Sequence, residues 1–369
     1  MACCSRAVRR AAVVCSVAAA LGWAARAEAH QGPQSYCTVL TVPGGVDVEI
    51  ETPLEHLTRP LGQSARPSEA TVRARAPELA AKIERRVQAR TALGRCDVER
   101  EAPRVVQRDV QSLTLLLRFY CPEGSVRLEN AWPLELDPGA HSLCAVDGAA
   151  WVVRPDSLTY EVGAPKTVQA TLREFLELGA RHVLSGIDHV LFLLALLVHA
   201  AWDRLREPLG RRFGGVALLV TSFTLGHSLT LLAAGLGWLI LSTRVVESVI
   251  ALSVVLVGVS NAVQPRARGR PLVAAGFGLV HGLGFAASLG DTELPRRAAV
   301  LALLAFNVGI ELAQLALVLA VFPVLAYAAR RPGYRPWFAV PVSCLIAAFG
   351  ALWFVKRAIG TDFLPWLGG

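Results

Sequence analysis

The chain has 369 residues, of which 53% are hydrophobic and 18% charged, and its formal net charge is +8. Its mean hydropathy of +0.45 excludes an ordinary soluble enzyme. The charge does not indicate nucleic-acid binding, because the arginines of the second half fall in short loops between apolar runs. Residues 30–165 are mixed and polar, whereas residues 179–359 are mostly long apolar runs. We therefore expect a soluble part followed by a membrane-embedded part.

Residues 1–29 have the three parts of a secretory signal peptide. Three arginines precede the apolar stretch 11–23, and Ala27-Glu28-Ala29 follows it. This pattern predicts cleavage after Ala29 and export, with an uncleaved signal anchor as the alternative. Cleavage would expose His30 as a terminal residue whose amine and imidazole suit copper or nickel. The simpler interpretation is that His30 merely follows the cleavage site.

Residues 30–165 predict a small, sandwich-like β-rich domain with a helical insertion. The glycines of Pro43-Gly44-Gly45 favour a hairpin between the first two strands. The expected strands are Tyr36–Val42, Val46–Ile50, Ser112–Tyr120, Val126–Leu136 and Trp151–Val153. Between them, Glu69–Thr91 carries apolar residues at four-residue spacing, which predicts one amphipathic helix.

Four cysteines of the exported domain predict two disulfides, because the count is even and the compartment oxidising. They are Cys37, Cys96, Cys121 and Cys144, and all three connectivities stay open. The domain shows no Ser-His-Asp order and no zinc spacing. We therefore expect it to sense, to cap or to bind a periplasmic protein partner.

Residues 170–369 predict an all-α polytopic bundle of about six transmembrane helices. The expected spans are 179–200, 214–236, 240–263, 272–290, 297–328 and 337–359. Pro323 should kink or end the fifth span. The first, third and fifth loops are the arginine-rich ones, so they should be cytoplasmic. This orientation puts residues 30–165 on the periplasmic side of a bacterial-type inner membrane. A signal peptide requires the same side.

The predicted spans carry ionisable residues, which are costly in a bilayer and usually functional. His182 and His189 are seven residues apart, so a continuous helix would place them on one face. The candidate metal ligands are His182, Asp188, His189, His227, Glu247, His281 and Glu311. The supporting polar candidates are Ser185, Ser248, Asn307 and Gln314.

The topology predicts the depth of these residues. His182 and Glu247 should lie nearer the outer mouth than the other candidate ligands. Imidazoles combined with carboxylates suit nickel, cobalt, zinc or iron. For each histidine alone, the alternative is a structural hydrogen bond between helices.

At these residues the chain resembles the HupE/UreJ family of membrane proteins, which are proposed nickel or cobalt permeases linked to hydrogenase and urease maturation. The resemblance covers about residues 175–355. It rests on His182-x-x-x-Gly186-x-Asp188-His189, Gly226-His227-Ser228, Glu247-Ser248, His281-Gly282 and Asn307-x-x-x-Glu311. The better-known members are small and usually have His-Pro in the first motif, whereas here Val183 follows the histidine. Nickel or cobalt transport is what the resemblance implies.

Three functions stay open on the sequence. The first is a secondary permease, in which Asp188 or Glu311 couples protonation to metal release and the metal is cargo rather than a tightly bound cofactor. The chain has no G-x-x-x-x-G-K-[ST] loop for ATP. The second is an intramembrane metal-dependent hydrolase with zinc held by histidines. The third is a non-catalytic accessory or receptor protein that acts through residues 30–165. The expected partners are the lipid bilayer, the metal ion and a periplasmic protein, and no nucleic acid.

Overall fold

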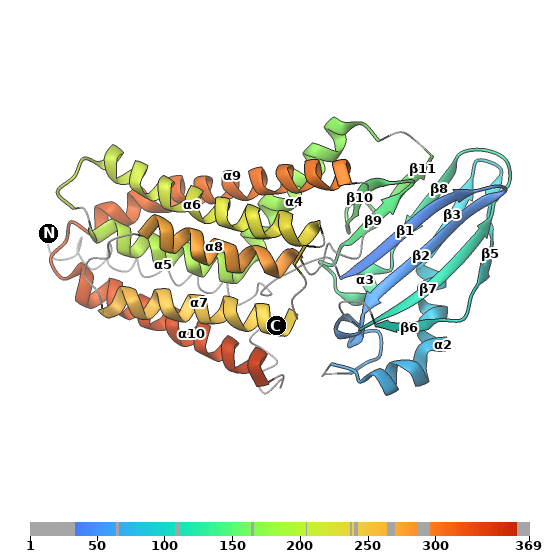
Figure 1. Cartoon of the computed structure of the whole chain (residues 1–369), viewed down its shortest axis with the longest axis horizontal. Helices are drawn as coiled ribbons and strands as arrows, with labels where there is room; N and C mark the ends of the chain where they lie inside the picture. Colours follow the sequence, from blue (N-terminus) through green and yellow to red (C-terminus); the bar gives the residue numbers. More distant parts are fainter. Residues whose placement is uncertain are drawn as a thin grey trace, which may run out of the picture.

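The structure is a computed structural model that places a β-rich N-terminal part beside a helical C-terminal part (Figure 1). This order confirms the predicted fold class. The structure describes residues 34–63, 66–107, 111–163, 166–203, 205–236, 238–239, 243–263, 270–286 and 296–359. The predicted signal peptide and His30 lie outside the described residues.

The β-rich part consists of two sheets, which we call the β-sandwich. The larger sheet has the order β10-β9-β1-β2-β7-β5, with β6 also paired to β7. Its strands are β1 (Ser35–Val42), β2 (Gly45–Pro53), β5 (Asp97–Arg100), β6 (Arg104–Gln107), β7 (Gln111–Tyr120), β9 (Ser142–Val146) and β10 (Ala149–Val153). The smaller sheet has the order β11-β8-β3-β4 and consists of β3 (Val87–Thr91), β4 (Gly94–Arg95), β8 (Val126–Asn130) and β11 (Thr159–Val162).

Alternating side chains bury one face of each sheet. In β2, Val46, Val48 and Ile50 are fully buried, whereas the acidic residues between them are partly exposed. The helix α2 (Glu69–Arg86) adds Leu79 and Ile83 to the same core. The predicted hairpin joins β1 to β2, and Gly44 there has a φ of 84°, which favours glycine.

Two predicted elements of the β-sandwich were wrong in extent. The helix ends at Arg86, because Val87–Thr91 alternates buried and exposed residues and pairs with β8 instead. The predicted strand 126–136 stops at Asn130 and is followed by the short helix α3 (Pro133–Leu136). Proline lacks the N–H that a strand needs, but it is tolerated in the first turn of a helix.

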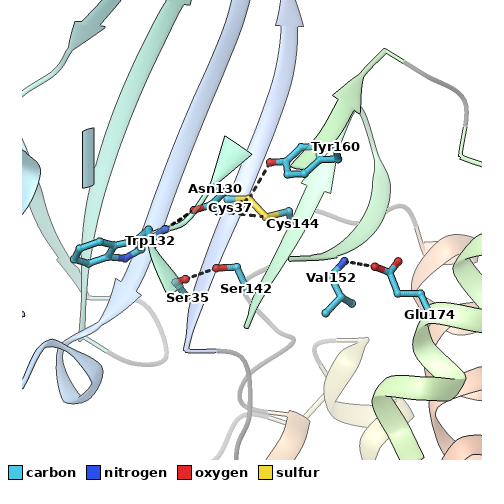
Figure 2. Close-up of a disulfide and its surroundings, with 9 residues drawn as sticks. All are labelled: Ser35, Cys37, Asn130, Trp132, Ser142, Cys144, Val152, Tyr160 and Glu174. Atoms are coloured by element: carbon cyan, nitrogen blue, oxygen red, sulfur yellow. Dashed lines mark hydrogen bonds between the residues drawn. A yellow bond between two sulfur atoms is a disulfide. The ribbon is translucent and has the colours of Figure 1, made fainter. Parts of the chain in front are cut away.

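Two disulfides close the β-sandwich. Cys37 and Cys144 are direct neighbours on the parallel strands β1 and β9, and they form one bridge (Figure 2). Asn130 and Tyr160 contact this bridge from the smaller sheet, so it lies between the two layers. Cys96 and Cys121 form the other bridge.

Removing the first bridge should destabilise the β-sandwich more than removing the second. The paired cysteines are 107 residues apart in the first and 25 in the second. Chain-entropy estimates give losses of about 5 and about 3.5 kcal/mol. Hydrogen exchange of β1 and β2 in the full chain, with each cysteine pair replaced by alanine, measures the two losses. Equal losses, or a larger one for the second bridge, would contradict the expectation.

The helical part begins with two helices that meet at a sharp bend. Its helices are α4 (Val168–Ser185), α5 (Ile187–Asp203), α6 (Leu209–Gly235), α7 (Thr243–Val263), α8 (Arg270–Ala286), α9 (Arg296–Ala328) and α10 (Val340–Ile359), the last preceded by the π-helical turn η2 (Arg335–Ala339).

Among the described residues, four helices are long and apolar enough to cross a membrane: α6, α7, α9 and α10 with its preceding turn. The pair α4 and α5 makes a fifth if it is one span, and the apolar stretch of α8 is shorter. The count of six therefore stays a prediction. The helix α9 continues through Pro323, so this proline does not end it.

The predicted continuous helix over 179–200 was wrong. The helices α4 and α5 meet at an angle of 70°, and Gly186 between them has an extended backbone. Glycine is a poor helix former. A Cβ atom at this position would lie 2.8 Å from the His182 carbonyl oxygen and 2.9 Å from His189 Nδ1, so the break itself requires glycine.

Glycines bring two pairs of helices into backbone contact. A Cβ atom at Gly226 of α6 would lie 2.1 Å from the Ala275 oxygen, and one at Gly278 of α8 would lie 2.0 Å from the Phe223 oxygen. In the same way, Gly309 of α9 faces the Leu176 oxygen of α4 at 2.0 Å. Small residues permit such close approach inside membranes. The helix α6 is thus packed tightly against α8, and α4 against α9.

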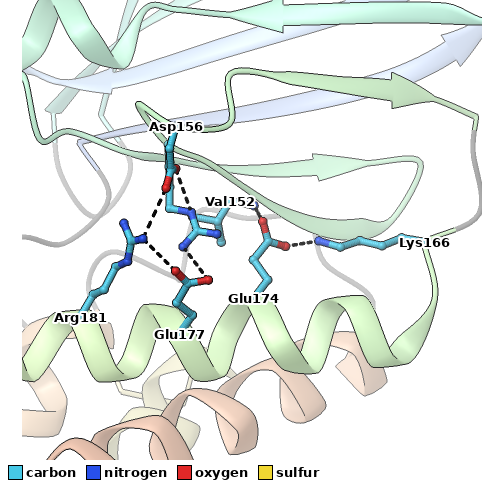
Figure 3. Close-up of polar contacts among 7 residues, drawn as sticks. Val152, Asp156, Lys166, Glu174, Glu177 and Arg181 are labelled. Atoms are coloured by element: carbon cyan, nitrogen blue, oxygen red, sulfur yellow. Dashed lines mark hydrogen bonds and ion pairs between the residues drawn. The ribbon is translucent and has the colours of Figure 1, made fainter.

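The β-sandwich is docked on α4 through a polar network (Figure 3). Glu174 accepts a hydrogen bond from the Val152 amide at 3.0 Å and pairs with Lys166. Farther along α4, Glu177 lies 2.8 Å from Arg181 and 3.3 Å from Arg154, and Arg181 reaches Asp156 at 3.3 Å. Apolar residues of both parts share one buried cluster: Tyr36, Leu143 and Val152 with Phe175, Leu178 and Phe306. The β-sandwich therefore holds the segment of α4 from Glu174 to Arg181.

Acid should destabilise the β-sandwich through His141. This side chain is 8% exposed, and burial, with the positive charges of Arg154 and His56, lowers its pKa to about 4. The unfolded chain takes up a proton below about pH 6.5, whereas the folded one does so only near pH 4, so stability falls as the pH falls between these values. The full cost is about 3 kcal/mol. Unfolding free energies at pH 7.5 and 4.5 should differ less in His141→Gln than in the wild type. An unchanged difference would contradict this assignment.

Candidate metal-binding site

Five of the predicted ligands lie together in the helical bundle, and we call them the histidine cluster. They form two overlapping groups of buried side chains, one of His182, His189 and His227 and one of Asp188, His189 and His281. Within each group, one ligand atom from every residue lies within 4.8 Å of the others. Because His189 belongs to both groups, it connects them.

The break between α4 and α5 brings the first two histidines into contact. Seven residues of continuous helix would separate His182 and His189 by about 10 Å along the axis. Their ring centroids are instead 4.8 Å apart, because His182 lies in the last turn of α4 and His189 in the first turn of α5. The ring centroid of His182 also lies 6.4 Å from that of His227, and its expected position nearer the outer mouth stays a prediction.

Helices α6 and α8 complete the cluster from either side. The ring of His227 on α6 lies 6.3 Å from that of His189, and the ring of His281 on α8 lies 5.3 Å from it. The close contact of α6 and α8 at their glycines holds both rings beside the break.

Phenylalanines enclose the histidine cluster. Phe192 and Phe223 lie 5.4 and 5.2 Å from the His281 ring, and Phe306 lies 5.4 Å from the His182 ring. All three phenylalanines are buried. An apolar shell of this kind keeps solvent away and strengthens the interaction of ligands with a cation.

Asn307 and Ser253 form a second layer behind His227 and His281, and Asp188 contacts His189 within the cluster. Asp188 Oδ1 lies 3.1 Å from His189 Nδ1, and Asn307 Oδ1 lies 3.1 Å from His227 Nδ1. Ser253 Oγ lies 2.9 Å from His281 Nε2. Ser253 was not singled out from the sequence. The available signal was a lone hydroxyl in the apolar run 249–259 of the third predicted span.

Two predicted carboxylate ligands lie outside both groups. Glu247 Oε2 is 3.7 Å from Arg357 Nε of α10, whose guanidinium also donates to the Glu247 carbonyl. Glu311 accepts a hydrogen bond of 2.5 Å from the Thr221 hydroxyl. Each of these two carboxylates therefore interacts with a side chain of another helix.

Of the four supporting polar residues, Asn307 is the one with a hydrogen bond to the histidine cluster among the described residues. Ser185 and Ser248 donate to carbonyl oxygens one turn earlier in their own helices, those of Arg181 and Arg244. Gln314 accepts a hydrogen bond from Thr224.

The donor set suits a divalent first-row transition metal. Buried imidazoles and one carboxylate are typical ligands for nickel, cobalt, zinc or iron, whereas magnesium and calcium prefer oxygen ligands. The described cysteines do not contribute, because four form disulfides and Cys344 is exposed on α10.

Comparisons with known proteins place the helical part in a family. A family model described as HupE / UreJ protein matches residues 159–357, which is more than half of the chain and includes all the candidate ligands. No curated protein and no solved structure matches the chain. The greater part of the β-sandwich precedes the matched region.

Proposed function

Because the chain belongs to the HupE/UreJ family, we propose that it is a secondary permease for a divalent transition-metal ion, nickel or cobalt. The family match and the apolar helices make it a multi-pass membrane protein related to metal transport. The observation that supports the finer proposal is the pair of buried ligand groups that share His189 beside a broken helix. Broken helices are a recurring feature of transporter binding sites.

The two groups suggest a stepwise path for the ion. The ion is first bound by His182, His189 and His227, and then by Asp188, His189 and His281. Because His189 takes part in both steps, the ion keeps at least one ligand while the others exchange. The Asp188 carboxylate offsets part of the double positive charge in the second group.

The arginine-rich loops suggest the direction. By the positive-inside rule, the β-sandwich is periplasmic. It therefore contacts α4 on the side of the membrane from which the ion enters. The protein would then carry the ion from the periplasm to the cytoplasm across the inner membrane.

Uptake into proteoliposomes tests this function. The full chain is reconstituted with a metal-sensitive dye inside the vesicles, and nickel or cobalt is added outside. Wild type should load the vesicles, and His227→Ala and His281→Ala should load them at least about tenfold more slowly. The control is His199→Ala, since His199 is buried in α5 but belongs to neither group.

Two other results would replace the proposal. Stoichiometric zinc that resists chelation, without uptake, would support the intramembrane hydrolase. Folded wild-type protein that binds no metal would leave an accessory role for the β-sandwich.

A further inference from the structure

We propose that Ser253 is a positioning residue of the histidine cluster: it holds His281 as the tautomer protonated at Nε2, so that Nδ1 is the atom that ligates the ion. The inference deepens the proposed function, since it concerns how the second ligand group is built. It rests on hydrogen bonds of Ser253 and on a comparison with the other histidines.

The Ser253 hydroxyl has one proton and two neighbours. It donates to the Ile250 carbonyl oxygen at 2.6 Å, one turn earlier in α7. A carbonyl oxygen can only accept, so this contact uses the proton. The same Oγ lies 2.9 Å from His281 Nε2, and the imidazole must therefore be the donor there. The opposite assignment would leave two oxygen atoms 2.6 Å apart with no proton between them.

His189 and His227 have the opposite tautomer, with the proton on Nδ1. The Asp188 carboxylate can only accept, so His189 Nδ1 carries the proton. The Asn307 amide donates through Nδ2 to the Leu303 carbonyl at 2.8 Å, which turns its oxygen toward His227 Nδ1. Both imidazoles therefore keep the lone pair on Nε2, whereas His281 keeps it on Nδ1.

Ser253 thus determines which nitrogen His281 offers to the second group. A neutral imidazole has one lone pair, and it binds a metal only through that nitrogen. Without the Ser253 acceptor, the hydrogen bond that favours the proton on Nε2 is lost, and the tautomer with the proton on Nδ1 gains population. Partners that fix ligand tautomers are typically worth 10–100-fold in metal affinity.

The experiment measures directly which ring nitrogen of His281 carries the proton. The full chain is labelled with ¹⁵N-histidine, and metal-free protein is studied by NMR, where protonated and unprotonated ring nitrogens resonate far apart. The His281 signals are those missing from His281→Ala. Wild type should show a proton on Nε2. Ser253→Ala should lose this preference and bind nickel about 10–100-fold more weakly, and Ser253→Thr, which keeps the hydroxyl, should restore both.

A matched control separates this role from packing. Ser343 is also buried and donates to a carbonyl oxygen in its own helix, that of Ala339, at 2.7 Å. Ser343→Ala should leave the His281 signals and nickel affinity unchanged. The inference is overturned if wild-type His281 is protonated at Nδ1, a result that needs His281→Ala only to assign the signals, or if Ser253→Ala changes neither the tautomer nor the nickel affinity. A tautomer shift in a protein that moves no metal would instead refute the permease and leave the role of Ser253 intact.

Discussion

Replacing His189 with alanine should abolish nickel and cobalt binding, whereas replacing His227 or His281 should only weaken it. His189 belongs to both ligand groups, so its loss leaves neither with three ligands. Loss of a second-layer partner costs about 10–100-fold in affinity, and loss of the shared ligand should exceed about 100-fold. Equilibrium dialysis of the purified full chain against nickel measures the effect.

The folding of the variant must be followed in the same samples. His189 is buried and packs against Phe223, so some loss of stability is expected. Binding lost at a temperature where the variant is fully folded identifies a ligand. Affinities of His189→Ala and His227→Ala within a few-fold of each other would show that the two groups do not share His189.

Replacing Gly278 with alanine should lower the free energy of unfolding by about 3 kcal/mol and impair metal binding. A Cβ atom there would lie 2.0 Å from the Phe223 carbonyl oxygen and 3.0 Å from the His227 backbone nitrogen. Both are backbone atoms and cannot rotate away, so α6 and α8 must separate. That movement carries His227 on α6 away from His281 on α8. Thermal unfolding in detergent and nickel affinity measure the two consequences.

Gly276 provides the control in the same helix. A Cβ atom at Gly276 meets nothing within 4 Å among the described residues, so Gly276→Ala adds a methyl group without a clash. Alanine is up to about 1 kcal/mol better than glycine in a helix, so this variant should be as stable as the wild type or more so. Equal losses in both variants would mean that α6 and α8 are not in backbone contact.

Local patterns predicted the larger features of the fold. Alternating apolar and polar residues predicted β2, and long apolar runs predicted α6, α7 and α9. The break at Gly186 was missed, because one glycine in an apolar run costs a helix only about 1 kcal/mol and does not show whether the helix bends. The contacts that require glycine arise only in the bent backbone, where a Cβ at this position would meet His182 and His189.

The candidate site was predictable as a set of residues but not as an arrangement. Asp188, Glu247 and Glu311 are equivalent on the sequence, since each is a carboxylate in an apolar segment. Their roles diverge through residues far along the chain, such as Arg357, which lies 110 positions after Glu247. Asn307 was predicted as a supporting residue, but its pairing with His227 was not, and Ser253 was missed, because 80 and 28 positions separate the two from their histidines.

Docking of the β-sandwich on α4 also sets an order for biogenesis. Domains fold from the N-terminus as the chain is made, and β1, β9 and both disulfides precede Val168, the first residue of α4. The residues that receive Glu174 and Glu177 therefore leave the ribosome before α4 does. A β-sandwich that folds in this order offers α4 a docking surface before the later helices assemble around His182.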